Sequence, residues 1–420
     1  MCILAKMSGN LLGFKILKFL ELCDWKVLKV DGSIPFEENL LCPCGEENLR
    51  TLCTLVGNEG KQKIRIGCCP SCGYIGYINR PSGEWISRFY AEMWDKRGEK
   101  GQREEEVKEE GRLILSKDKR RMRNLEKLMQ RFEISRQRPV LEIGSGYGGT
   151  LKLLEALGFE NLVGTEASLH RAEAGSNGHN LQVLAGAFED EHVQSELRTK
   201  APFGLIFSHH VLEHTLHPDK VIEAASRLQE PEDFLLLSLP NAAGEPTLSS
   251  VLYFPHLHSF TKYSLETLLQ NHHYEVVDDS FTKPRELSIL AKKTSRLPKR
   301  TPHSGDGFAE GRNKLIQGLD LGTMSRKQRR LIACYRHIDI GVKLPLFQTK
   351  TGEEIEKALL PRFLPFFHHS RLAAQAGRHR ASKRHAMLLL AVETLSRRFT
   401  SPEESPLEVQ FEGNIMLTYK

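Results

Sequence analysis

Short apolar runs alternate with longer amphipathic segments between residues 115 and 293. Apolar runs bounded by glycine or polar residues are typical of buried strands, and apolar residues at helical spacing are typical of helices. The predicted strands are 140–143, 161–165, 181–185, 203–210 and 234–239, and the predicted helices are 118–132, 150–157 and 219–228. This alternation predicts an α/β fold, with helices covering a parallel sheet. Segments 274–281 and 286–293 are predicted to close the sheet as an antiparallel pair, which gives seven strands.

A glycine-rich turn follows the first predicted strand. Gly144, Gly146, Gly148 and Gly149 lead into the next helix, and Glu142 lies inside the strand. Glycines let the backbone approach a ligand closely, and a strand, a glycine turn and a helix together are typical of nucleotide-binding sheets. The spacing differs from the G-x-G-x-x-G of dinucleotide sites. The turn alone does not decide between a nicotinamide, a nucleotide and an adenosyl ligand.

A second acid, Glu166, ends the next predicted strand. It follows the glycine turn by roughly twenty residues, the spacing of the acid that binds the ribose hydroxyls of an adenosine ligand. A carboxylate suits this place because it accepts two hydroxyl hydrogen bonds. The alternative is an ordinary exposed acid at a strand end.

Two motifs resemble those of class I S-adenosylmethionine-dependent methyltransferases. The first is E-x-G-x-G at 142–146, and the second is F-x-L-I-x-x-x-x-V-L-E-H-x-x-x-P at 203–218, which is similar to ubiquinone- and menaquinone-biosynthesis members of the family. The resemblance implies a seven-stranded Rossmann-like methyltransferase sheet, methyl transfer, and S-adenosylmethionine as cofactor. Ala187 and Gly204 depart from it, because the family has Asp at both places.

The site residues expected from the strand ends and from this resemblance form three groups. Those predicted to bind the cofactor are Glu142, Gly144, Ser145, Gly146, Tyr147, Gly148, Glu166, Ala167, Phe188, Ser208 and His209. The candidate bases are His210 first, then His209 and His214, since a neutral imidazole accepts a proton near pH 7. Each of them is alternatively a structural histidine. The predicted substrate contacts are Tyr90, Asn241, His256 and His258.

Six of the nine cysteines lie between residues 42 and 72, in two knuckles, LCPCG and GCCPSCG. Paired knuckles predict a structural zinc site of the zinc-ribbon type, with Cys42, Cys44, Cys69 and Cys72 as ligands. The first knuckle is one residue shorter than usual, so Cys53 or Cys68 is an alternative ligand. A set of free thiols in a small core is the other possibility. The clustering and the odd number of cysteines argue against a disulfide scaffold and for a reducing, cytoplasmic location.

An aromatic segment follows the cysteines. Trp85, Phe89, Tyr90 and Trp94 recur at helical spacing, which predicts a helix docked on the next domain. A ribbon followed by such a helix resembles the front end of bacterial sugar methyltransferases. That resemblance implies a small-molecule acceptor, a sugar or nucleotide-sugar, with Tyr90 reaching it.

These patterns divide the chain into five parts. Residues 1–38 are predicted as an N-terminal helical segment, 39–95 as the zinc-ribbon-like domain with the aromatic helix, 96–114 as a charged linker, 115–293 as the methyltransferase domain, and 294–420 as a basic, mostly helical extension. No apolar run reaches the roughly eighteen residues of a membrane span.

The basic extension leaves other functions open. The net charge of +6 is unevenly spread, and the extension predicts an anionic partner or else a solvated helical appendage. An RNA methyltransferase that uses the ribbon and this tail is one alternative function, and a non-catalytic cofactor-binding scaffold is another. The oligomeric state is not predictable from these patterns.

Overall fold

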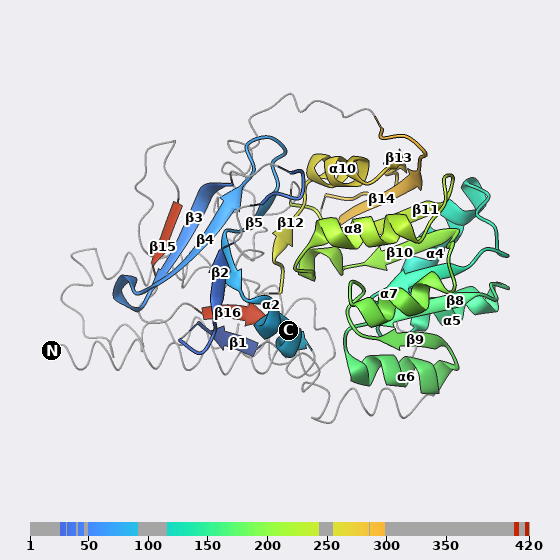
Figure 1. Cartoon of the computed structure of the whole chain (residues 1–420), viewed down its shortest axis with the longest axis horizontal. Helices are drawn as coiled ribbons and strands as arrows, with labels where there is room; N and C mark the ends of the chain where they lie inside the picture. The colour runs from blue at the N-terminus through green and yellow to red at the C-terminus, as the bar shows by residue number, and fades with distance from the viewer. Residues whose placement is uncertain are drawn as a thin grey trace, which may run out of the picture.

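The computed structural model describes residues 26–30, 32–38, 41–45, 49–90, 116–242, 255–284, 286–298, 407–410 and 416–419. Within them, a seven-stranded sheet with helices forms one part of the molecule, and a five-stranded sheet with two small strand pairs forms the other (Figure 1).

The seven-stranded sheet has the predicted strands. They are β7 (Val140–Ile143), β8 (Leu162–Glu166), β9 (Gln182–Ala185), β10 (Leu205–His209), β11 (Phe234–Pro240), β13 (Tyr274–Asp278) and β14 (Glu286–Lys293), in the order β13-β14-β11-β10-β7-β8-β9. Strands β7 to β11 are parallel, and β14 runs antiparallel to both β11 and β13. The predicted sheet and its closing antiparallel pair are confirmed.

Helices cover both faces of this sheet, because its strands are apolar on both sides. Leu141 and Ile143 of β7 pack in one core cluster with α7 (Glu191–Arg198), α8 (Pro218–Arg227) and α10 (Lys262–Asn271). Val140 packs in a second cluster with α4 (Ser116–Arg131) and α5 (Gly149–Ala156). Helix α6 (Leu169–His179) lies against β8 and β9. The result is a three-layer α/β/α domain.

The second part is built on the cysteine-bearing segment. Its sheet has the order β12-β5-β4-β3-β15, from β3 (Arg50–Gly57), β4 (Gln62–Cys68), β5 (Ile75–Tyr77), β12 (His258–Ser259) and β15 (Leu407–Gln410). The two pairs are β1 (Lys26–Lys29) with β16 (Met416–Tyr419), and β2 (Phe36–Glu38) with β6 (Asn79–Pro81). A 3-10 turn, η1 (Asn58–Gly60), joins β3 to β4, and α2 (Gly83–Arg88) follows β6.

Both ends of the chain differ in part from the prediction. Within the predicted helical segment 1–38 the described residues include strands β1 and β2, so the helix prediction concerns residues 1–25, which lie outside the described residues. Two short stretches of the predicted helical extension are strands, β15 beside β3 and β16 beside β1 (Figure 1, red). The linker 96–114 and residues 299–406 lie outside the described residues. None of the described helices is long and apolar enough to cross a membrane.

Strand β12 joins the two parts. It lies in the loop after β11 of the large sheet, yet it pairs with β5 of the smaller one (Figure 1). The buried Arg80 donates a hydrogen bond from Nη1 to the Leu216 carbonyl oxygen at 2.6 Å. Tyr74 and Ile78 belong to the same hydrophobic cluster as Leu141. The two parts therefore share one core, and the smaller sheet holds the segment after β11 in place.

Candidate active site

The glycine turn at the end of β7 leaves open space beside its backbone. Gly144 and Gly146 have φ angles of 70° and 60°, a left-handed region that favours glycine. A Cβ added at Gly144 would lie 2.3 Å from Val211 Cγ2, whereas one added at Gly146 would meet nothing within 4 Å. The turn is therefore closed beneath Gly144 and open at Gly146, where a ligand can approach the backbone.

Glu166 and the glycine turn are in direct contact. Glu166 Oε2 accepts a hydrogen bond from the Gly146 amide at 2.8 Å, and its Oε1 accepts one from the Ser168 amide at 3.1 Å. Glu142 is 1% exposed in the middle of β7, opposite Gly164 of β8. The two acids lie on adjacent strands, and Glu166 is the one that reaches the open side of the turn.

Most other predicted cofactor residues lie around this edge of the sheet. Ser145 is buried, and its Oγ has no hydrogen-bond partner among the described residues. Gly148 is the N-cap of α5, and Tyr147 lies beneath the Arg171 guanidinium at 5.8 Å. The remaining members are Ala167, which is exposed, and Phe188 and Ser208, which are buried.

The two positions that depart from the family pattern have local explanations. The Ala187 amide donates a hydrogen bond to Asp190 Oδ2 at 2.9 Å, so a carboxylate reaches this turn from three residues later. A Cβ at Gly204 would lie 2.5 Å from Arg138 Cβ, so the Arg138 side chain occupies the space of any side chain there.

His210, the first-choice base, sits at the tip of β10 in an unusual backbone conformation. Its φ is 57°, uncommon for a residue other than glycine, and its side chain is 41% exposed. Its Nδ1 lies 3.2 Å from Glu213 Oε1. Because a carboxylate only accepts hydrogen bonds, Nδ1 carries the proton, and Nε2 is the nitrogen able to accept one.

Glu213 and His214, in the 3-10 turn η3 (Leu212–His214), form a cluster with His256. One ligand atom from each lies within 4.8 Å of the others. His214 Nδ1 is 2.7 Å from the Pro255 carbonyl oxygen and 3.2 Å from the Tyr90 hydroxyl. The structure therefore brings together three residues predicted separately, Tyr90, His214 and His256.

Burial sets the protonation of this cluster. It lowers the pKa of His214 and lowers that of His256 to about 3, because a charged imidazole loses hydration there. Burial would raise the pKa of Glu213, but the neighbouring His214 and the hydrogen bond from His210 outweigh it and lower that pKa to about 2. At neutral pH the cluster therefore combines an ionised carboxylate with two neutral imidazoles.

His258 has a structural place instead of the expected substrate contact. It is 4% exposed, with Nδ1 bonded to the Tyr74 hydroxyl and Nε2 2.8 Å from the Thr215 carbonyl oxygen. Both ring nitrogens are thus engaged where the two parts of the molecule meet. Asn241, also a predicted substrate contact, follows β11, and its Nδ2 is 3.5 Å from the Lys283 carbonyl oxygen.

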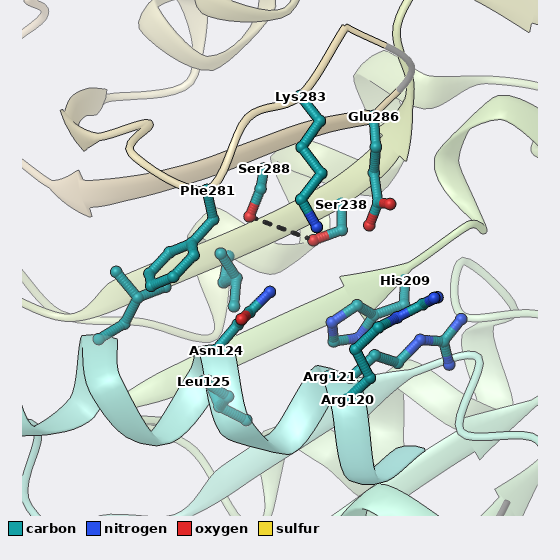
Figure 2. A pocket seen from close by; sticks show the side chains of 12 residues that line it. Arg120, Arg121, Asn124, Leu125, His209, Ser238, Phe281, Lys283, Glu286 and Ser288 are labelled. Carbon is teal, nitrogen blue, oxygen red and sulfur yellow. Dashed lines mark hydrogen bonds between the residues drawn. The ribbon is translucent and has the colours of Figure 1, made fainter. Parts of the chain in front are cut away.

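A basic pocket lies beside His209, between the start of α4 and the ends of β10, β11 and β14 (Figure 2). Its charged lining residues are Arg120, Arg121, Lys283 and Glu286, and Ser238 and Ser288 form its floor. These basic residues were not predictable as a group, because Arg120 and Lys283 are more than 160 residues apart and no local sequence pattern links them.

The four predicted cysteine ligands come together. Cys42 Sγ is 3.4 Å from Cys72 Sγ, and Cys44 Sγ is 3.7 Å from Cys69 Sγ. Sulfur atoms on one tetrahedral zinc are roughly 3.8 Å apart, given Zn–S bonds of about 2.3 Å. Cys53 and Cys68 are buried elsewhere in the small sheet and are not members of this group. The donor set fits a structural zinc.

Comparison with known proteins identifies the larger part. A family profile described as "Methyltransferase domain" matches residues 114–279. This part of the chain is therefore similar to methyltransferase domains. The open glycine turn, Glu166 and the buried Ser145 hydroxyl fit an adenosyl ligand such as S-adenosylmethionine.

Solved structures similar to this domain include several methyltransferases. CcbJ from Streptomyces caelestis has 15% identity and a TM-score of 0.36, covering 45% of this chain and 96% of its own. An S-adenosylmethionine-dependent methyltransferase from Clostridium acetobutylicum has 10% identity and a TM-score of 0.36, covering 48% and 100%. A possible histamine N-methyltransferase from Thermotoga maritima has 15% identity and a TM-score of 0.31, covering 42% and 97%. A search of curated protein sequences finds no match.

Glu213 is the central residue that the sequence analysis did not assign. It stands within the V-L-E-H motif, but its role depends on His256, which lies 43 residues further along the chain. The one sequence pattern that could have indicated a role for Glu213 was the motif itself, which sets an acid beside a histidine just after a buried strand.

Proposed function

We propose that this protein is a class I S-adenosylmethionine-dependent methyltransferase that acts on a small-molecule acceptor, a sugar or nucleotide-sugar. The observation that carries the methyltransferase assignment is the contact between Glu166 and the Gly146 amide at an open glycine turn, within a matched methyltransferase domain. The acceptor class is supported by the basic pocket and by the sequence resemblance described above.

Different residues at the sheet edge bind different parts of the cofactor. Glu166 accepts hydrogen bonds from the ribose hydroxyls, and the backbone at Gly146 lies against the ligand, because a Cβ there would meet nothing within 4 Å. Glu142 is buried in β7, two residues before the turn begins. When bound, S-adenosylmethionine supplies an activated methyl group on a positively charged sulfur.

His210 acts as the base for an acceptor hydroxyl. Glu213 accepts a hydrogen bond from His210 Nδ1 and so orients the His210 ring. The His210 side chain is half-exposed, which leaves its Nε2 able to accept the hydroxyl proton. The cofactor would supply the methyl group, and the chain would hold the acceptor oxygen in line with it while His210 takes up the hydroxyl proton. Alignment of these groups and removal of the proton are what the chain contributes.

The basic pocket suits the phosphate groups of a nucleotide-sugar. Arg120, Arg121 and Lys283 gather beside His209, one residue before the proposed base (Figure 2). A guanidinium group binds phosphate oxygens through two parallel N–H donors, so Arg120 and Arg121 are the proposed phosphate contacts.

The cofactor assignment is tested by calorimetry with S-adenosylhomocysteine. We expect binding by the wild-type protein and a loss of about tenfold or more for Glu166→Gln, because the amide accepts only with its oxygen and carries no charge. Glu173→Gln, an exposed acid on α6, is the matched control and should bind like wild type. No heat of binding with the wild-type protein would refute the proposal.

The catalytic assignment is tested with His210→Ala and labelled S-adenosylmethionine against a panel of UDP- and dTDP-sugars. We expect kcat to fall by about 10²- to 10⁴-fold with little change in S-adenosylhomocysteine affinity, since a base acts in the transition state. An unchanged kcat would exclude His210 as the base. Turnover only with another acceptor, such as total RNA, would overturn the acceptor class.

We further propose that Cys42, Cys44, Cys69 and Cys72 bind a structural zinc ion. The support is the closeness of the four sulfur atoms, all buried or half-buried at the junction of the two parts. A site closed by four thiolates leaves no position for a substrate, so its role is to stabilise the fold.

A further inference from the structure

The cluster of Glu213, His214 and His256 contains a buried carboxylate oxygen that no described residue satisfies. Glu213 is 1% exposed, and its Oε2 has no hydrogen-bond partner among the described residues. A buried carboxylate oxygen without a partner is costly, and proteins satisfy such groups with a donor or a cation. A hydrogen-bond donor or a cation is therefore expected beside Glu213 Oε2 when the site is functional.

The orientation of His214 points to a cation. Its Nδ1 faces the Pro255 carbonyl oxygen at 2.7 Å and must carry the proton, since a carbonyl only accepts. Its Nε2 thus presents a lone pair, and that nitrogen lies 3.7 Å from Glu213 Oε1. A proton or a metal ion between these two acceptors would make the contact attractive. A backbone carbonyl that accepts a hydrogen bond from the other ring nitrogen is also the usual support of a metal-bound histidine.

His256 completes the donor set from another element. It lies just before β12, the strand that pairs with the small sheet, and its ring centroid is 4.9 Å from that of His214 with the planes at 64°. The three ligand atoms lie within 4.8 Å of one another. Ligands about 2.0–2.2 Å from a single ion are roughly 3–4 Å apart, so a shift of less than an ångström brings all three onto it.

We propose that Glu213, His214 and His256 bind a divalent transition-metal ion beside the methyl-transfer site. Two imidazoles and a carboxylate select zinc, iron, cobalt or manganese over magnesium. Three protein ligands leave coordination positions open. On the proposed function an open position would suit an acceptor hydroxyl oxygen, because His210, the proposed base, lies between β10 and η3.

Cobalt(II), titrated into the full-length protein loaded with only one equivalent of zinc for its four-cysteine site, tests the proposal. Cobalt on thiolates gives an intense near-ultraviolet charge-transfer band, whereas cobalt on nitrogen and oxygen gives only weak visible bands. We expect the wild-type protein to bind cobalt with the second signature. Glu213→Gln and His256→Ala should each weaken that binding at least tenfold. His170→Ala, an exposed histidine of α6, is the matched control and should bind like wild type.

Two outcomes would overturn the proposal: no nitrogen–oxygen cobalt signal with the wild-type protein, or equal cobalt affinity in all four proteins. Glu213→Gln preserves the side-chain size, and circular dichroism with S-adenosylhomocysteine binding checks that each variant is folded. The proposed function fails separately, if the wild-type protein does not bind S-adenosylhomocysteine. The metal proposal fails if that ligand binds and cobalt does not.

Discussion

Gly204 shows how one residue of this domain is fixed by its neighbour. It opens β10 next to Arg138, whose Nη2 donates a hydrogen bond to the buried Asp233 Oδ2 at 2.8 Å. The family carries Asp at the position of Gly204, but here a Cβ would overlap Arg138 Cβ. Glycine and Arg138 are thus a matched pair, and the departure carries no information about catalysis.

We therefore predict that Gly204→Ala destabilises the protein. The added methyl group must displace Arg138 and weaken its ion pair with Asp233, at a cost of about 1–3 kcal/mol in the free energy of unfolding. Urea titrations followed by circular dichroism measure this change. Gly32→Ala is the control, because a Cβ at Gly32 meets nothing within 4 Å. Equal stability of the two variants would contradict the steric explanation.

Residue roles were predictable where they depend on local spacing. The grouping of the four cysteines and the acid at the end of β8 follow from short motifs, and the structure brings the four sulfur atoms together and sets Glu166 against the glycine turn. His258 was not predictable, because its alternation with His256 says nothing about Tyr74 and Thr215, which engage its two nitrogens. Such partners come from other elements, and only the fold brings them together.

At the scale of elements, the strands of the large sheet were predictable and those near the C-terminus were not. Strand β10 is a buried apolar run followed by a helix, which is a strong signal. Strands β15 and β16 have four residues each, too few for a periodic pattern. Their partners β3 and β1 lie more than 350 residues earlier in the chain. Pairing between segments so far apart in the chain cannot be recognised from local sequence patterns.

Strand β15 should protect β3 of the small sheet against amide hydrogen exchange. Truncation after residue 406 removes β15 and leaves β3 as an exposed edge, so we predict faster amide hydrogen exchange in β3 while β7 and β10 are unchanged. Exchange mass spectrometry of peptides from residues 50–57 and 140–143 measures both effects. A second truncation, after residue 412, retains β15 and should preserve the protection of β3. Unchanged exchange in both truncations would show that β15 does not protect this edge.

At the scale of the molecule, the small sheet is a support for the methyltransferase site. Strand β12 pairs with β5, and the Thr261 hydroxyl donates a hydrogen bond to the Cys72 carbonyl oxygen at 3.4 Å. Between these contacts and η3 lies the short segment that carries His256. The second cysteine knuckle thus contacts the segment just after His256, one of the residues proposed to bind metal.

Loss of zinc should therefore weaken the whole molecule and not the small sheet alone. Cys42, Cys69 and Cys72 belong to the same hydrophobic cluster as Leu141 and Ile206 of the large sheet. We predict that Cys72→Ser abolishes zinc binding, measured by plasma mass spectrometry, and lowers the melting temperature in one transition that includes both sheets, because bound metal contributes to folding free energy. Cys53→Ala, buried in β3 outside the ligand group, is the control and should keep its zinc. Two separate transitions, with the methyltransferase domain melting at the wild-type temperature, would show that the shared core does not couple them. In that case the small sheet would be an independent domain, and the position of His256 would have to be fixed by the large sheet alone.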